Sequence, residues 1–163
     1  RRARPRRRRQ LPQPDLIMSD ERKKPSVGAR EAGSIGDQTP FELVGGADKI
    51  KAIVETFYDV MSEQEPALAR LHPCDEAGIV SRESRDRFAL FFIGWLGGPD
   101  DYVNIHGHPR LRRRHAHLTV DEAMRDAWIR SMTVALDAHA VRGDVRAFLD
   151  ARLYEVADFL RNT

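Results

Sequence analysis

Residues 88–118 read FALFFIGWLGGPDDYVNIHGHPRLRRRHAHL, and this stretch changes character near its middle. Large apolar residues in its first part recur at the spacing of one helix face; they are Phe88, Phe91, Phe92, Trp95 and Leu96. The Gly-Gly-Pro of residues 97–99 predicts the end of that helix. A long polar connection from Gly97 to Thr119 follows, and it holds four of the six histidines and four arginines. The sequence therefore predicts a buried helix beside a segment rich in imidazole and cationic groups.

Three other segments show helical spacing. Apolar residues of 50–61 occupy one face of a helix that begins after a pair of glycines. Thr119 and Glu122 form a Thr-x-x-Glu capping box, which predicts the start of a third helix. Residues 145–160 carry the apolar stripe of a fourth helix, and no alternating strand pattern occurs. The predicted fold class is all-α, with four main helices.

Length and composition limit the class of protein. A chain of 163 residues, 41% hydrophobic and 32% charged, suits one globular domain. No apolar stretch approaches the roughly 20 residues that span a bilayer, so we expect no membrane segment. The single cysteine, Cys74, excludes an internal disulfide and is typical of a reducing compartment. We therefore expect a cytoplasmic protein.

Charge divides the chain into two parts. Residues 1–40 carry 11 Lys and Arg against 5 Asp and Glu, whereas residues 41–163 carry 16 against 20. The first part lacks apolar periodicity, so we expect residues 1–40 to be a disordered basic extension that contributes nothing to a domain over 41–163. Its arginine run could bind nucleic acid; alternatively, Met18 could start the native protein.

The histidines allow more than one kind of site. Neutral imidazole is a good ligand for iron, zinc or copper. A zinc site is one hypothesis, although the chain lacks the cysteine pairs that would strengthen it. A nucleic-acid-binding module using residues 1–9 and 110–114 is another, but the net charge of −4 over residues 41–163 argues against it.

Several segments together resemble one family. They are FELVGGADKIKAIVETFYDVM, LHPCDE, FFIGWLGGPDDY, GHPRLRRRH and RDAWIRSM, in that order along the chain. The set resembles the second group of truncated haemoglobins and covers nearly all of residues 41–162. This resemblance implies a two-over-two helical sandwich that encloses haem b, with the helix before the iron ligand shortened to a loop.

The resemblance also implies roles for particular residues. His115 in RLRRRH matches the proximal iron ligand, although His117 competes with it because the usual His-x-Pro-Phe is replaced by His-Ala-His-Leu. Trp128 and Tyr58 match the distal tryptophan and tyrosine, and His72 falls where a further distal hydrogen-bond donor is expected. Four residues match the distal wall: Ser84, Phe88, Phe91 and Phe92. Three match propionate contacts: Arg87, Arg114 and Tyr102.

The implied function is reversible dioxygen binding at a five-coordinate ferrous haem. Distal donors would stabilise the partial negative charge on dioxygen. Nitric-oxide dioxygenation or a reaction with peroxide would be compatible activities, and nitric oxide and carbon monoxide would be further ligands. Turnover would need an electron donor that this chain does not encode. We expect a monomer or a homodimer.

Overall fold

The computed structural model describes residues 32–163, and the secondary structure of this part is helical. The helices are α1 (Pro40–Val44), α2 (Ala47–Gln64), α3 (Pro66–Ala69), α4 (Arg82–Trp95), α5 (Asp101–His106), α6 (Leu111–His115), α7 (Glu122–Ala138) and α8 (Gly143–Phe159). The only strand-like pairings among these residues are two isolated bridges. The predicted all-α class is confirmed, while the disorder expected for residues 1–31 lies outside the described residues.

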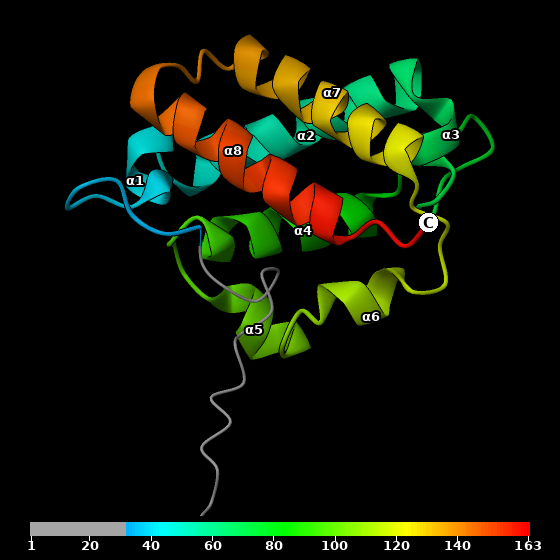
Figure 1. Ribbon diagram of the computed structural model, residues 1–163, viewed down its shortest axis with the longest axis horizontal. Helices are drawn as coiled ribbons and strands as arrows, with labels where there is room; N and C mark the ends of the chain where they lie inside the picture. The colour runs from blue at the N-terminus through cyan, green and yellow to red at the C-terminus, as the bar shows by residue number, and fades with distance from the viewer. Residues whose placement is uncertain (1–31) are drawn as a thin grey trace, which may run out of the picture.

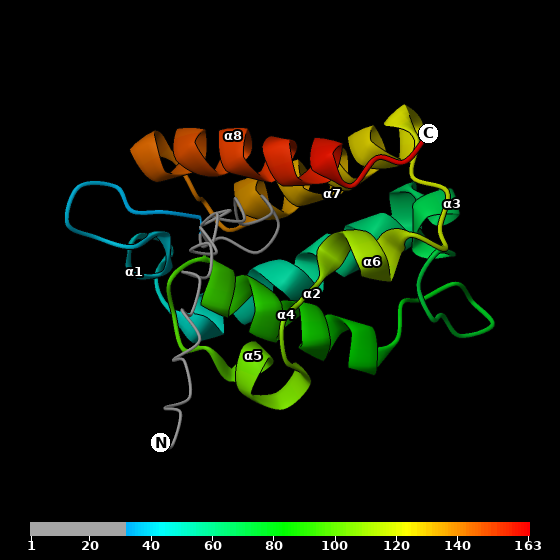
Figure 2. The ribbon, with the colours of Figure 1, turned by 60° about the horizontal axis from the view of Figure 1, so that its bottom comes forward.

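Four long helices form two packed pairs. Helix α2 packs on α4, α7 packs on α8, and α2 joins the pairs by packing on α7. The two pairs lie one over the other, as Figures 1 and 2 show, which is the expected two-over-two arrangement. The short helices α5 and α6 lie beyond α4, on its side away from α8 (Figure 1).

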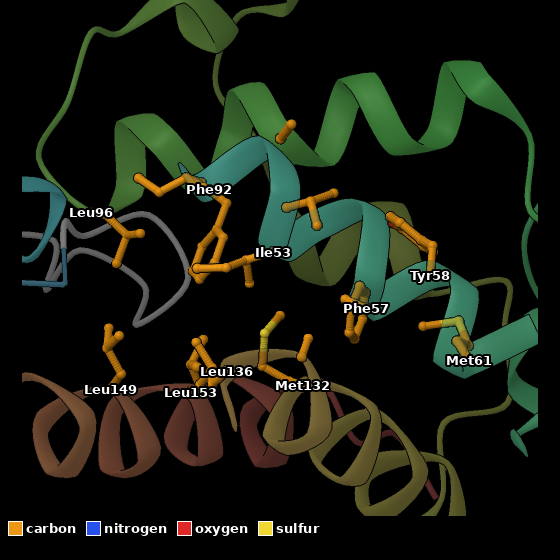
Figure 3. Packing of buried hydrophobic residues seen from close by; sticks show 14 of the residues in the cluster. Ile53, Phe57, Tyr58, Met61, Phe92, Leu96, Met132, Leu136, Leu149 and Leu153 are labelled. Atoms are coloured by element: carbon orange, nitrogen blue, oxygen red, sulfur yellow. The ribbon is translucent and has the colours of Figure 1, made fainter. Parts of the chain in front are cut away.

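The core lies between α2, α4 and the α7–α8 pair. Figure 3 shows side chains of all four helices meeting there. The predicted faces are buried, and their most deeply buried members are Ile50, Ile53, Phe57, Met61, Phe92, Leu96, Leu136 and Leu149. Burial of such side chains contributes roughly 1.5–3 kcal/mol each. This core fixes the four long helices and thereby the walls of the site described below.

Two glycines explain why α4 stops where it does. A Cβ on Gly98 would lie only 2.5 Å from the ring of Phe41, and one on Gly97 would lie 2.9 Å from the Thr39 side chain. Only glycine allows α1 to approach the end of α4 this closely. The amide N–H of Phe41 then donates to the carbonyl of Leu96 at 2.8 Å.

The expected domain boundary at residue 40 is too late. The amide N–H of Ala32, a buried residue, donates to the carbonyl of Trp95 at 2.8 Å, and Arg152 Nε donates to the carbonyl of Ala32 at 3.1 Å. Thr39 caps α1 through a capping box with Glu42. Residues 32–40 therefore belong to the folded part, because their backbone groups are hydrogen-bonded to α4 and α8 despite the low apolar content.

The connection from Gly97 to Thr119 also differs from the prediction. It contains α5 and α6, which are too short to show a clear apolar period. Helix α7 is capped by Asp121, whose carboxylate accepts the amide N–H of Met124 at 2.9 Å. The predicted capping box at Thr119 is wrong, because the ionised Asp121 two residues later is the stronger acceptor. Within residues 32–163 no helix is long and apolar enough to cross a membrane.

Candidate functional site

One cavity gathers all of the predicted site residues. It has a volume of about 290 Å³, and side chains of α2, α4, α5, α6, α7 and α8 line it. The eleven predicted residues among them are Tyr58, His72, Ser84, Arg87, Phe88, Phe91, Phe92, Tyr102, Arg114, His115 and Trp128. They come from segments as far apart as residues 58 and 128, so the fold brings together what the sequence separates.

The imidazole of His115 is held in one tautomer. Its Nδ1–H donates to the carbonyl of Leu111, one turn earlier in α6, at 2.7 Å. A carbonyl can only accept, so Nδ1 carries a proton, and in the neutral imidazole the lone pair is then on Nε2. This is the tautomer that a metal ligand needs, with the second nitrogen fixed by a backbone acceptor.

His117 lies elsewhere. It is exposed and lines a separate surface hollow with Arg112 and Arg113, outside the cavity that His115 lines. The two histidines therefore face different surroundings, which favours His115 over His117 as the ligand.

A residue after α8 holds the segment that follows His115. The Asn162 side-chain Nδ2 donates to the carbonyl of Leu118 at 2.8 Å and to the carbonyl of His115 at 3.4 Å. No sequence pattern predicts this contact, because a single asparagine has no periodicity or motif to mark it. It closes the α6 side of the cavity onto α8.

Tyr58 and Trp128 flank an aromatic cluster on the side of the cavity formed by α2, α4 and α7. The Tyr58 ring packs edge-on against Phe88, with centroids 5.9 Å apart, and the Trp128 ring packs edge-on against Phe88 at 6.3 Å and Phe57 at 5.3 Å. Burial raises the pKa of the Tyr58 phenol above its usual range. Tyr58 is therefore a neutral O–H group at physiological pH, and Trp128 is an N–H donor.

His72 packs edge-on against Tyr58, with ring centroids 5.6 Å apart. Burial lowers the pKa of His72, which keeps the imidazole neutral at pH 7. Its Nδ1–H donates to the carbonyl of Leu68 at 3.2 Å, so Nε2 carries the lone pair and accepts. The structure thus favours His72 as an acceptor near Tyr58, in contrast to the donor expected from the sequence.

A buried guanidinium supports Tyr58 from outside the cavity. Arg85 Nη1 contacts Asp59 at 2.7 Å and Glu55 at 3.0 Å, and Arg85 Cζ lies 5.8 Å from the centroid of the Tyr58 ring. Its Nε donates to the carbonyl of Val80 at 3.0 Å. Arg85 therefore joins α2 to α4 directly beside Tyr58.

The remaining lining has an apolar wall and several cations. Phe88 stacks between Phe91 and Phe92, with ring centroids 6.3 and 5.5 Å away. The wall also contains apolar residues that the sequence did not predict as site residues, although several of them belong to predicted helical stripes. They are Leu68, Leu71, Trp95, Leu111, Leu118, Val120, Met124, Leu153, Val156, Ala157 and Leu160. Sequence reasoning also missed Arg125, a third arginine of the lining, which is paired with Asp126 and Asp158.

Two polar atoms of the lining residues lack partners among residues 32–163. Arg87 Nε and Trp95 Nε1 are both buried, and neither makes a hydrogen bond there. Buried N–H groups without an acceptor are costly, by about 1–3 kcal/mol each. Carboxylates of a bound group would supply such acceptors, and the nearby guanidinium of Arg114 would add charge complementarity.

The lining fits haem. It combines an apolar aromatic wall, one imidazole with a free Nε2, and arginines suited to propionates. A zinc cluster has less support, because no three His, Cys, Asp or Glu side chains gather around a common point within residues 32–163. A helical sandwich around such a cavity defines a haem protein of the globin class.

The chain belongs to the bacterial-like globin family, whose family model matches residues 39–161. It is 32% identical over 123 residues to the group 2 truncated hemoglobin YjbI of Bacillus subtilis, covering 76% of this chain and 88% of that protein. Its fold is similar to that of two solved structures, both with a TM-score of 0.70. The group II truncated hemoglobin of Bacillus anthracis is 35% identical in sequence, and the matched region covers 77% of this chain and 92% of that protein. The truncated hemoglobin of Pseudoalteromonas haloplanktis is 37% identical, and the matched region covers 77% of this chain and 99% of that protein. Haem is the cofactor of this family, so the predicted cofactor is confirmed.

Proposed function

We propose that this chain binds dioxygen reversibly at ferrous haem b, with His115 as the only protein ligand to the iron. The observation that carries the proposal is the position of His115, whose Nδ1 is bonded to the Leu111 carbonyl, in the same cavity as Tyr58 and Trp128. Family membership supports the coarser statement that the chain is an oxygen-binding globin. The assignment of individual residues is our own.

The distal residues divide the hydrogen bonding among them. Ferrous haem supplies reversible ligation of diatomic gases, and dioxygen acquires partial negative charge when it is bound in this way. The Trp128 N–H can only donate a hydrogen bond, so it is always able to stabilise the partial negative charge on dioxygen. Tyr58 can donate as well, whereas His72 in its neutral tautomer accepts and can hold the Tyr58 hydroxyl in place. We therefore assign Trp128 the largest share of the stabilisation.

The phenylalanine wall restricts water. Phe88, Phe91 and Phe92 present three adjacent rings to the cavity. Such a surface slows the entry of water and protons, which would otherwise promote oxidation of a bound ferrous haem. The wall therefore favours a long-lived oxygenated form.

Strong retention of dioxygen favours reaction over release. Haem, when bound, would supply the one electron with which nitric oxide and dioxygen combine to give nitrate, and an external donor would have to return that electron before the next turnover. Nitric-oxide dioxygenation is thus an activity that this distal arrangement supports, and a reaction with peroxide is a second. Both require the same class of external reductant.

Absorption spectroscopy tests the proposal directly. The purified protein, reconstituted with haem, should give a Soret band, and the reduced protein should give distinct spectra with dioxygen and carbon monoxide. Return of the deoxy spectrum when oxygen is removed under argon would establish reversibility. Failure of haem to bind, or immediate oxidation to the ferric form in every oxygen mixing experiment, would contradict the proposal.

A further inference from the structure

The outer surface of the segment that carries His115 is strongly cationic. Residues 102–120 contain four arginines and no aspartate or glutamate. The other residues of 41–163 therefore carry 12 Lys and Arg against 20 Asp and Glu, a net charge of −8. The positive charge of the domain is thus concentrated on one short stretch of a surface that is otherwise acidic.

The four guanidinium groups of this segment make no ion pair with other residues of 32–163. By contrast, arginines of the four long helices such as Arg82, Arg130 and Arg146 each contact a carboxylate. Unpaired exposed guanidinium groups retain their full capacity to bind an external anion. Arg110, Arg112 and Arg113, which unlike Arg114 do not line the cavity, are therefore available for a partner in a way that the paired arginines are not.

Arg112, Arg113 and His117 line a surface hollow next to the residues that follow α8, and we call these three residues the basic face. The guanidinium of Arg112 lies over the ring of Phe159, with Cζ 4.8 Å from the centroid, which fixes one cation in place. Arginine is enriched at protein-binding surfaces, so two exposed guanidinium groups, one of them held in place, suit a protein partner.

The same segment is the wall of the cavity. Its inward side contributes Leu111, Arg114 and His115 to the lining, while Arg112 and Arg113 point to the outer hollow. Figure 2 shows α6 on the outside of the molecule, with no other helix in front of it. A molecule on the basic face is thus separated from His115 by about one helix diameter, roughly 10 Å.

We propose that the basic face is the docking site of an acidic redox protein that supplies electrons to the haem. The proposal rests on the proposed function, because only a haem that is oxidised during its reaction needs such a donor. In each transfer the reduced donor loses one electron and the ferric iron gains it, and no bond is made or broken. The net charge of −8 on the rest of the domain repels an extended polyanion such as nucleic acid. A compact acidic patch, in contrast, can contact the basic face alone.

A charge-reversal pair tests the docking site. Arg112→Glu/Arg113→Glu changes the net charge by −4 and leaves all lining residues of the cavity in place. Lys51→Glu/Arg142→Glu makes the same change in net charge at two exposed positions outside residues 102–120. Arg142 is the N-cap residue of α8 and is a helix length, about 25 Å, from Phe159 at the other end. The two variants therefore differ in where the charge is changed and agree in its amount.

The probe is a bacterial flavodoxin, a small acidic flavoprotein, and the haem-loaded ferric protein is the partner. Calorimetric titration with oxidised flavodoxin measures docking, and stopped-flow mixing with reduced flavodoxin measures the second-order rate constant of haem reduction. At about 0.01 M salt, where the Debye length is about 30 Å, reversal at the basic face should lower affinity and rate constant by about tenfold or more. The control pair should stay within about twofold, and reduction of all variants by dithionite should be equal. The affinity and rate constant of a milder Arg112→Gln/Arg113→Gln variant should lie between those of the parent and those of the charge-reversal pair.

Three outcomes would overturn the proposal. One is equal loss in both variants, which would mean that only net charge matters. Another is flavodoxin binding that survives reversal of the basic face in a protein with an unchanged Soret band and thermal midpoint. The third is tighter binding of this face to a short DNA duplex or to vesicles containing phosphatidylglycerol than to flavodoxin. Because docking is measured on the ferric protein, failure of dioxygen binding would contradict the proposed function without affecting this result.

Discussion

Asn162 and Val120 exchange two hydrogen bonds: the amide N–H of Val120 donates to Asn162 Oδ1, and the amide N–H of Asn162 donates to the carbonyl of Val120, both at 3.0 Å. The same side chain reaches the carbonyls of Leu118 and His115 through Nδ2. One residue thus bonds to four backbone groups between the last residue of α6 and the start of α7. The position of the proposed iron ligand therefore depends on a residue 47 positions later in the chain.

Asn162→Ala should loosen haem without unfolding the domain. It removes the side-chain bonds to residues 115–120, each worth about 1 kcal/mol or less at an exposed site. We expect haem loss to an excess of apomyoglobin to become roughly three- to tenfold faster. The iron–histidine stretching band in the resonance Raman spectrum of the ferrous protein should shift or broaden as well. Thr163→Ala is the control, and an unchanged rate and band in Asn162→Ala would show that α6 holds His115 unaided.

Separate substitution of the two neighbouring histidines tests the ligand assignment. His115 lines the cavity, whereas His117, beyond the end of α6, lines a separate surface hollow, so the two cannot both face the iron. His115→Gly should abolish tight haem binding, or make it depend on added imidazole. His117→Ala should leave the Soret band unchanged, because His117 lies on the outer surface. Rescue by imidazole of a His117 variant would mean that the register of the segment is wrong.

Sequence patterns predicted the parts of the fold that depend on repeated apolar spacing. The faces of α2, α4, α7 and α8 were predictable because each buries several residues at helical intervals. Helices α5 and α6 were missed, since five or six residues carry too few apolar positions and these helices are held by tertiary contacts. The prediction of the lining residues came from the family resemblance. Neither that resemblance nor spacing could give the tautomer of His72, which depends on one hydrogen bond to Leu68.

Loss of the Glu55 charge should destabilise the protein at neutral pH only. The guanidinium groups of Arg82 and Arg85 bind Glu55 and lower its pKa below the usual value, against the opposing effect of burial. A group with a lowered pKa in the folded state adds stability above its unfolded pKa, and this is lost as the pH falls through the folded pKa. Because Glu55 is 39% exposed, solvent screening limits its contribution. We expect Glu55→Gln to lower the free energy of unfolding at pH 7 by about 0.5–1 kcal/mol.

Urea unfolding at several pH values checks the sign of this effect. The difference between parent and Glu55→Gln should shrink as the pH falls below about 4, where the parent carboxylate becomes protonated too. Glu63→Gln removes a charge from the same helix at an exposed position that makes no ion pair with other residues of 32–163, and it should have little effect. A Glu55→Gln deficit that is constant with pH would point to packing instead of charge.

Truncations should separate residues 32–38 from those before them. Deleting residues 1–30 keeps the Ala32 amide and its bond to Trp95, so the Soret band and thermal midpoint should stay nearly unchanged. Deleting residues 1–38 also removes the contact of Ala32 with Arg152 and should cost about 1–3 kcal/mol. Differential scanning calorimetry of both haem-loaded proteins measures the contrast. Equal midpoints would mean that residues 32–38 contribute no stability.

Trp128→Phe tests the distal assignment, because it keeps an aromatic ring and removes the N–H. A hydrogen bond to a charged acceptor is worth about 1.5–3 kcal/mol, or roughly 10- to 150-fold in an equilibrium constant. Most of this change should appear in the off-rate. Stopped-flow mixing should therefore show dioxygen leaving about 10- to 100-fold faster, with faster autoxidation. Carbon monoxide carries little charge when bound, so its dissociation should change much less.

Comparison with other substitutions in the cavity decides whether the effect comes from the hydrogen bond or from ring size. Trp95→Phe makes the same change in size, but the buried N–H that it removes is one that we assign to a carboxylate of the bound group and not to dioxygen, so dioxygen dissociation should stay within about twofold. Tyr58→Phe should have a smaller effect than Trp128→Phe, and His72→Leu the smallest, because His72 acts on dioxygen only through Tyr58. The Tyr58 and His72 effects should also be non-additive, since the two rings are in contact.

If Trp128→Phe leaves dioxygen dissociation within about twofold of the parent, which is below the smallest effect of a charged hydrogen bond, then Trp128 only packs against Phe88. The principal donor would then have to be Tyr58, and Tyr58→Phe should produce the tenfold or larger acceleration in its place.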